Sequence, residues 1–484
     1  MTLWLPGKHL ARARSIARLK PAHEPPPIFP IVVPGPNEVQ HQPPTPQDPL
    51  QVLPPELIGI VFQYWLIYEL DRRILDPSEL PLLLCRVSKS WKDFVYGTPL
   101  LWRFVSIDAA EHRTINLQAL QNRLSRAQNV PLVISLFIRA HPHLDALRIL
   151  FSFSHQFCEL SLMISNPRWW YEVPMAPFGT LEKLTVRTWP MAYDLRELSS
   201  VFFTAPLLHH LDWSAPTDPV LLLLTHGHQL RSLDLTVRLD VIQAFDVLAA
   251  CPNLCSASIS LLLETERSSD HKQIVLGNLT SLKLLGSSVL VQLLENMRAP
   301  LLSTFSIMWR GIEDSVLMHA LDPFLAHSPL LEDLTMENII FKEDALIEIL
   351  RAHPRISRLS VGALACNRPT GIMTNRTFRM LTRPNEETSE MTVLLPGLEQ
   401  LVIRRGLRVG DEVIIDMIES RCRSPPFSFP SRQHRTIKLV ELDWCETMAP
   451  ETICRLRNIC AKCGVTVKGS FIQENYQDWL RTSM

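Results

Sequence analysis

One sequence pattern recurs along most of this chain of 484 residues: two apolar residues three positions apart, followed by a third two positions further on. The first copy begins at Phe157 and the eleventh begins at Ile437. The first eight steps between copies are 22 to 29 residues long, and the last two are 42 and 39 residues long. A fixed period of this kind predicts a row of similar short units that stack on one another.

The period is typical of a leucine-rich repeat, in which each unit contributes one short strand and a return segment. Neither part can bury its apolar side without a neighbouring unit, so stacking would form one continuous core. Because side chains alternate along a strand, Leu184 and Val186 should face the core while Lys183 and Arg187 point away. Return segments such as 344–350 have apolar residues at helical spacing.

The predicted fold class is therefore α/β: a small N-terminal helical module followed by an irregular leucine-rich-repeat solenoid. In this horseshoe the parallel strands would line the inner side and the helices the outer side. We place the solenoid at residues 108–470 and a C-terminal tail or cap at 471–484. The alternative is a set of unrelated strands that share the pattern by chance.

Composition argues against several classes of partner. The net charge is −1 and the isoelectric point is about 7.0, so no global field attracts nucleic acid or an acidic membrane. The sequence has no uninterrupted apolar stretch of 18 or more residues. Its first residues do not show the charged segment, long apolar core and cleavage site of a secretion signal. We expect a soluble protein that is not secreted, is cytoplasmic or nuclear, and has no nucleic-acid or membrane partner.

The sequence carries no recognisable catalytic constellation: no Walker-type loop, dinucleotide glycine pattern, HExxH or Gly-x-Ser-x-Gly motif. Ten cysteines are too few for a disulfide scaffold, and Cys460-x-x-Cys463 lacks the second ligand pair that a zinc site needs.

Histidine pairs occur at His141 and His143, His209 and His210, and His226 and His228. They have no acidic or thiol partner at ligand spacing, so we expect solvated or capping histidines. The protein is predicted to be no enzyme and to hold no metal and no cofactor.

Residues 1–50 are predicted to form a disordered, basic and proline-rich tail. Residues 1–20 hold five lysines and arginines and no acidic residue, which suits either an organelle-targeting helix or a disordered tail. Thirteen prolines lie between Pro21 and Pro55, a density that prevents a packed core and indicates an extended, partly stiff linker. Docking of this tract to a polyproline-reading domain is an alternative.

Residues 51–107 are predicted to form the helical module. A proline at the first turn and Glu56 near the positive end of the helix dipole predict a helix that runs to about Leu70. This helix is apolar around most of its circumference, so it needs two partners. A second helix is predicted over 81–96, and a further strand over 131–136. No glycine-serine linker follows the module, so we expect the first repeat to pack directly on it.

Three sequence blocks stand in order within this module: residues 53–62 (LPPELIGIVF), 82–93 (LLLCRVSKSWKD) and 98–102 (TPLLW). Together they resemble an F-box, most closely of the fungal type. The resemblance implies a helical module that docks on the Skp-family adaptor of a cullin–RING ubiquitin ligase. It also implies that the C-terminal repeats select the substrate.

Apolar residues exposed at a helix start are expected to contact the adaptor, because so small a module has too little core to bury them all. The predicted adaptor-binding residues are Leu53, Pro54, Pro55, Glu56, Leu57, Ile58, Val61, Leu83, Val87, Trp91 and Trp102. For Trp91 the alternative is packing within the module itself.

Charged residues that point away from the core are expected to select the substrate, since charge on a polar wall discriminates between partners. They are Lys183, Arg187, Asp333, Glu337, Arg358 and Arg404. A merely solvated face is the alternative, and the serine-rich middle indicates either close backbone approach or tight strand packing. The two long steps leave room for loops at Asn367–Glu390 and Arg421–His434, which are either part of the binding face or insertions.

The sequence thus predicts a non-catalytic substrate-recognition subunit of an SCF-type ubiquitin ligase. Its partners would be a Skp-family adaptor, through it a cullin scaffold, and an unknown substrate protein. The alternative is a leucine-rich-repeat scaffold or regulator without a ubiquitin-ligase role, in which the F-box-like segment only closes the end of the solenoid.

Overall fold

The computed structural model divides the chain into two units, Met1–Leu53 and Pro54–Met484. The residues it describes are 49–54, 56–62, 64, 80–109, 115–138, 143–164, 172–173, 177–188, 205–214, 227–261, 273–310, 314–339, 342–362, 373–383, 393–404, 407–422, 436–443 and 450–469. Most of the predicted N-terminal tail and all of the predicted C-terminal tail lie outside them. The described end of the first unit holds the short helix α1 (Pro49–Val52), which includes the last two residues of the predicted tail.

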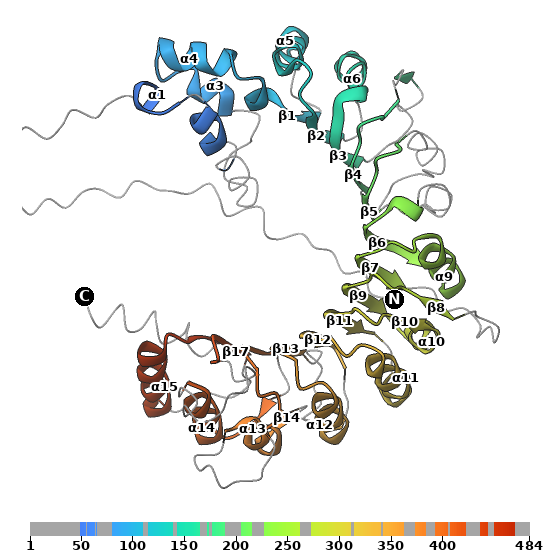
Figure 1. The fold of residues 1–484 in the computed structure, drawn as a ribbon, viewed down its shortest axis with the longest axis vertical. Coiled ribbons are helices and arrows are strands. Elements are labelled where there is room, and N and C mark those ends of the chain that lie inside the picture. Colours follow the sequence, from blue (N-terminus) through green and yellow to red (C-terminus); the bar gives the residue numbers. More distant parts are fainter. Residues whose placement is uncertain are drawn as a thin grey trace, which may run out of the picture. The chain divides into compact units, whose positions relative to one another are not determined.

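One parallel sheet of 14 strands runs through the second unit, with the strands side by side in chain order (Figure 1). The strands are β1 (Phe104–Ala109), β2 (Leu132–Ile138), β3 (Phe157–Ile164), β4 (Lys183–Thr188), β5 (His210–Ser214), β6 (Ser232–Leu239), β7 (Ser256–Leu261), β9 (Ser281–Gly286), β11 (Thr304–Trp309), β12 (Asp333–Glu337), β13 (Arg358–Gly362), β15 (Gln400–Arg404), β17 (Leu439–Asp443) and β18 (Thr466–Gly469). Each neighbouring pair is parallel. The predicted α/β class is confirmed, with a solenoid-like succession of strands.

Each of the eleven copies of the sequence pattern coincides with one strand, from β3 to β17. The predicted alternation holds: in β12 the side chains of Leu334 and Met336 are fully buried, whereas those of Asp333, Thr335 and Glu337 are half-buried on the opposite face. β2 begins within the predicted strand at 131–136, and β18 extends the sheet beyond the last copy. A strand therefore forms wherever two apolar side chains can share one covered face.

A repeated backbone hydrogen-bond pattern fixes the register from one unit to the next. The carbonyl oxygen of Glu182 accepts from the amides of His209 and His210, at 3.0 and 3.1 Å. The same fork occurs across the first long step, where Ser357 O accepts from the amides of Glu399 and Gln400 at 2.8 and 3.0 Å. The longer steps therefore add chain between strands without changing how the strands pair.

Helices lie on one side of the row of strands, as Figure 1 shows for α9 to α12. They are α5 (Leu117–Ala127), α6 (Leu144–Phe151), α9 (Val241–Ala250), α10 (Val289–Glu295), α11 (Asp314–Ala326), α12 (Glu343–Ala352), α13 (Asn375–Leu381), α14 (Asp411–Cys422) and α15 (Pro450–Cys463). α12 confirms the helix predicted from apolar spacing at 344–350. Two short parallel pairs, β8 (Ile274–Val275) with β10 (Met297–Arg298) and β14 (Met373–Thr374) with β16 (Leu407–Arg408), stand apart from the main sheet.

The predicted loop at Asn367–Glu390 is wrong in part, because it contains β14 and α13. The side chain of Thr374 caps α13 by accepting from the amide of Arg376 at 3.2 Å. The predicted loop at Arg421–His434 begins with the last two residues of α14, and its remainder lies outside the described residues.

The helix predicted over 81–96 is also wrong, since it is two helices: α3 (Leu80–Leu84) and α4 (Lys89–Tyr96). Ser88 has an extended backbone, and its side chain accepts from the amide of Trp91 at 3.2 Å. This cap begins a new helix and so ends the previous one. The first predicted helix is helical over 56–62 and at 64, and its predicted continuation to Leu70 lies outside the described residues.

The N-terminal module packs directly on the first repeat, as the missing linker predicts. Trp102, in the 3-10 helix η1 (Pro99–Trp102), is buried, and its indole donates to the carbonyl oxygen of Val95 at 2.9 Å. Arg126 in α5 lies over the same indole, 4.7 Å from the ring centroid. Arg123 donates to the carbonyl oxygen of Phe104 at 2.8 Å. Module and repeats therefore share one core.

We expect Gly227→Ala to reduce the free energy of unfolding by about 1–3 kcal/mol, as other overpacked sites do. A β-carbon on Gly227 would lie 2.4 Å from the carbonyl oxygen of Ala250, which belongs to the next repeat and cannot move alone. Urea denaturation followed by circular dichroism measures the change. Gly179→Ala is the control, since nothing lies within 4 Å of its β-carbon position. Equal stability of the two variants would contradict the close approach.

Candidate functional site

One face of the first helix of the module is apolar and uncovered. Leu57, Ile60, Val61 and Tyr64 follow the spacing of a single helix face, and their exposed fractions are 48, 46, 56 and 72 %. We call these four residues the docking face. The opposite side packs inward: Ile58 is only 3 % exposed, and the Phe62 ring meets Trp91 edge to face. The helix thus has two apolar faces, as the sequence predicts, and among the described residues only one of them is packed against other side chains.

The other predicted adaptor-binding residues divide into exposed and buried groups. Leu53, Pro54, Glu56, Leu83 and Val87 are exposed. Pro55 lies outside the described residues.

Three predicted adaptor contacts pack within the module instead. Trp91 is half-buried against Phe62, which agrees with the alternative of internal packing. Ile58 and Trp102 are buried, so the prediction that they contact the adaptor is not compatible with their position in this fold. Ile58 lies on the covered side of the first helix, and Trp102 is part of the buried core.

The second candidate surface is the face of the sheet that points away from the helices, which we call the strand face. All six predicted substrate-binding residues lie on it, and all six take part in ion pairs, three of them between neighbouring strands and one across an intervening strand. The pairs are Lys183–Glu159 at 3.5 Å, Arg187–Asp212 at 2.8 Å, Arg358–Asp333 at 2.9 Å and Arg404–Glu337 at 3.1 Å. These charges are therefore compensated within the chain before any partner arrives.

The pair between Arg404 and Glu337 spans two strands. The register places Gly362 of β13 between them, opposite both residues. Because Gly362 has no side chain, the Arg404 guanidinium can cross it to reach the carboxylate. A β-carbon at Gly362 would already lie 3.5 Å from Cβ of Arg404.

The ion pairs are partly shielded from water, and the pKa values reflect this. The hydrogen bond with Asp212 raises the pKa of Arg187. Burial raises the pKa of Asp333, although the nearby Arg358 opposes the rise. Burial is thus the larger effect at Asp333, and pairing with Arg358 offsets only part of it.

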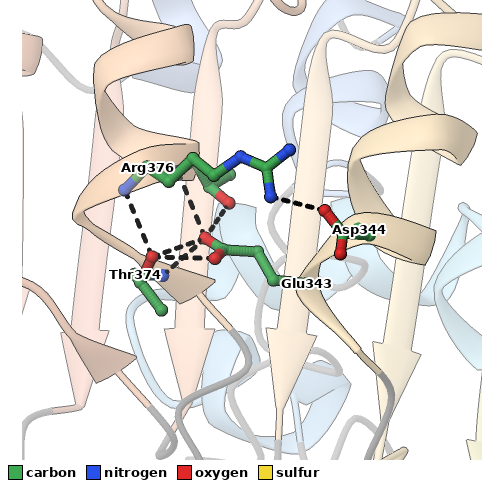
Figure 2. A network of polar contacts seen from close by, with 5 residues as sticks. Glu343, Asp344, Thr374 and Arg376 are labelled. Atoms are coloured by element: carbon green, nitrogen blue, oxygen red, sulfur yellow. Dashed lines mark hydrogen bonds and ion pairs between the residues drawn. The ribbon is translucent and has the colours of Figure 1, made fainter.

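A half-buried carboxylate binds the segment inserted in the first long step, and we call this arrangement the clasp (Figure 2). Glu343, at the first turn of α12, accepts from the amide and hydroxyl of Thr374, at 2.9 and 2.8 Å, and from the amide and hydroxyl of Thr377. Beside it Arg376 pairs with Asp344. Burial tends to raise the pKa of Glu343, but the hydrogen bonds outweigh burial and its pKa is lowered.

A buried arginine anchors the other end of the same insertion. Arg421, in the last turn of α14, donates to the carbonyl oxygens of Leu381, Leu395 and Leu394 at 2.7, 2.6 and 2.7 Å. Leu395 has a φ of 50°, which is unfavourable for this side chain. Burial lowers the pKa of Arg421 to about 9, and Arg383 nearby adds to the effect. The guanidinium therefore holds a strained turn in place.

Sequence reasoning missed both anchors. In the sequence, Glu343 cannot be told from an ordinary acidic residue at a helix start, and Arg421 cannot be told from an ordinary basic residue at a helix end. Their partners are 26 to 40 residues away along the chain, across segments that have no repeat pattern. A partial signal for the ion pairs did exist, because Asp333 and Arg358 occupy the same position in successive copies.

Two half-buried thiols at and near the cysteine motif, Cys460 and Cys422, have raised pKa values. Burial, together with a hydrogen bond to Cys463, raises the pKa of Cys422 to about 12, and burial raises that of Cys460. Such thiols are protonated at neutral pH and are poor nucleophiles. Among the described residues no group of three histidines, cysteines or carboxylates could hold a metal ion. Nor is any helix in the described ranges long and apolar enough to cross a membrane.

We expect Glu343→Gln to speed amide hydrogen exchange at Thr374 and Thr377 about fivefold at neutral pH, since a helix cap contributes about 1 kcal/mol. Because the folded pKa of Glu343 is lowered, its contribution is complete above the ordinary value of 4.5 and is lost as pH falls through the folded pKa. Protection of these amides in the native protein should therefore decline in acid below about 4.5, and the variant should show no such decline.

The matched control for this prediction is Asp344→Asn, next to Glu343 on the same helix. Asp344 forms an exposed ion pair with Arg376, and exposed pairs contribute little. Exchange at Thr374 and Thr377 should stay within about twofold of the native rate. Equal effects of the two substitutions would contradict the clasp.

Comparison with known proteins finds neither a family model that matches this chain nor a curated protein that matches it. The two surfaces must therefore be interpreted from their own chemistry. One is an uncovered apolar helix face in a small module, and the other is a wide polar face of a rigid sheet.

Proposed function

We propose that this protein is a non-catalytic substrate receptor of a cullin–RING ubiquitin ligase. In this role the N-terminal module is an F-box that docks a Skp-family adaptor, and the sheet is a leucine-rich-repeat solenoid that binds the substrate protein. The docking face carries the proposal, because four large side chains on one helix face stay exposed in a protein with an extensive core.

The adaptor half of the proposal is supported by sequence and exposure together. The three blocks that resemble an F-box include the docking-face residues Leu57 and Val61. Leu83 and Val87, from the second block, add further exposed apolar side chains. Uncovered apolar area of this kind is what a protein interface uses, and a few central residues usually contribute most of the binding free energy.

The substrate half is supported by how the module joins the repeats. Trp102 and Arg126 connect them through packed contacts, so an adaptor bound to the module would hold the strand face in a defined direction. A receptor of this kind accelerates transfer by holding two reactants close together, which requires no catalytic side chain of its own.

A second candidate function is a repeat scaffold in which the module serves only as a cap. The burial of Val95, Leu101 and Trp102 in the shared core favours this reading, because terminal repeats need a cover. A cap, however, does not need an apolar face that points away from what it covers. The docking face therefore favours the receptor.

We expect the double substitution Leu57→Arg with Val61→Arg to weaken adaptor binding at least about 30-fold, since the loss of even one interface anchor costs about 2 kcal/mol. Both side chains are about half exposed, so the thermal melt should change little. Co-purification with a Skp-family adaptor and titration calorimetry measure the binding.

Leu207→Arg is the matched control, because Leu207 is a 53 % exposed leucine in a turn of the repeats, outside the module. Its adaptor affinity should equal that of the native protein. If the native protein does not bind the adaptor at all, the scaffold becomes the better account. If the double variant binds as tightly as the control, the docking face is not the adaptor site.

A further inference from the structure

The centre of the strand face differs in charge from its two ends. Strands β7, β9 and β11 contribute only one charged side chain to it, Lys283. The strand register places Lys283 in one row between Ser258 and Ser306. Neighbouring strands are about 4.8 Å apart, so both hydroxyls lie next to the lysine stem.

Lys283 is exposed, and no described residue compensates its charge. Its ammonium group forms no ion pair with any described residue, whereas Arg187 and Arg358 on either side are paired at 2.8 and 2.9 Å. Asp234 occupies the same row but lies two strands away, about 10 Å. At that distance and exposure the attraction is weak, because solvent screens it.

The hydroxyls around Lys283 are also available to a partner. The side chains of Ser258 and Ser306 make no hydrogen bond with other described residues, and the same is true of Ser281 and Thr304 in the adjacent row. A hydroxyl can donate to an anion, and hydrogen bonds to a charged acceptor are stronger than neutral ones. Lys283 and its neighbours thus offer one cation and several donors to the same oxyanion.

The row on the other side of Lys283, two residues further along the strands, is mainly apolar. Leu285 and Met308 are half-buried and lie opposite each other in the register, two residues beyond Lys283 and Ser306 along their strands. Two residues of extended chain span about 6.6 Å. An extended peptide that lies along the strands would present its own alternate side chains at this same spacing.

We infer that the centre of the strand face binds an extended peptide segment with an anionic side chain two residues from an apolar one. The anionic group meets Lys283 with Ser258 and Ser306, and the apolar group meets Leu285 and Met308. The anion is a carboxylate or a phosphorylated hydroxyl, which share this chemistry. All three central strands are hydrogen-bonded on both sides, so the segment is held by side chains and not by strand addition. The inference names the substrate class of the proposed receptor. It rests on that proposed function only for what happens to the partner once it is bound.

The test uses the full chain and arrays of nine-residue peptides with a fixed central Glu, phosphoserine or Gln and all other positions randomised. We expect the Glu array, the phosphoserine array or both to retain about tenfold more protein than the Gln array, the effect of one charge-assisted contact. Bound peptides should be enriched in apolar residues two positions from the centre. Stronger retention by Glu identifies a carboxylate, and stronger retention by phosphoserine identifies a phosphate.

Lys283→Gln should remove the preference for the anionic arrays, and raising the salt concentration should reduce it. Lys462→Gln, at an exposed lysine of α15, is the matched control and should keep the preference. The inference is overturned if the Gln array binds equally well, if no array binds, or if the preference survives in Lys283→Gln. Adaptor binding is measured separately, so a chain that binds the adaptor but no anionic peptide would refute only this inference. A chain that binds the anionic peptide but not the adaptor would refute only the receptor role.

Discussion

Stacking of each repeat on the next is the interaction on which the rest of this structure depends. A single unit offers two apolar strand side chains, such as Leu334 and Met336, and these become fully buried only between neighbouring units. The carbonyl forks, as at Glu182 and Ser357, then fix the strands in one register. Every arrangement on the strand face follows from this regularity, because a fixed strand spacing sets side chains from different repeats in straight rows.

Local information in the sequence was sufficient for the repeat strands, their alternation and the outer helix α12, because each of these depends on residues close together in the chain. The break between α3 and α4 was missed because a single capping hydroxyl, that of Ser88, outweighed a continuous apolar pattern. The clasp at Glu343 and the anchor at Arg421 were missed for a different reason. Both depend on which distant segments meet, and the insertions between them carry no period.

The sequence predicts which side chains lie on each surface better than it predicts which of them are free to bind a partner. Alternation identifies which side chains point away from the core, so all six predicted charges lie on the strand face. It does not show whether a charge already has a partner in the next repeat. Likewise the blocks that resemble an F-box do not separate docking residues from core residues: Leu57 is exposed, whereas Trp102 is buried.

Charge pairing also explains why the ends and the centre of the strand face should behave differently. An ion pair such as Arg404–Glu337 must be broken before either group can bind a partner, so a partner gains little from it. Lys283 has no such pair with any described residue, and the hydroxyls beside it make no hydrogen bond to the part of the chain that the structure describes. A rigid sheet holds these groups in position before the partner arrives, which lowers the entropic cost of binding. The paired ends therefore stabilise the stack, while selection of an anionic partner falls to the centre.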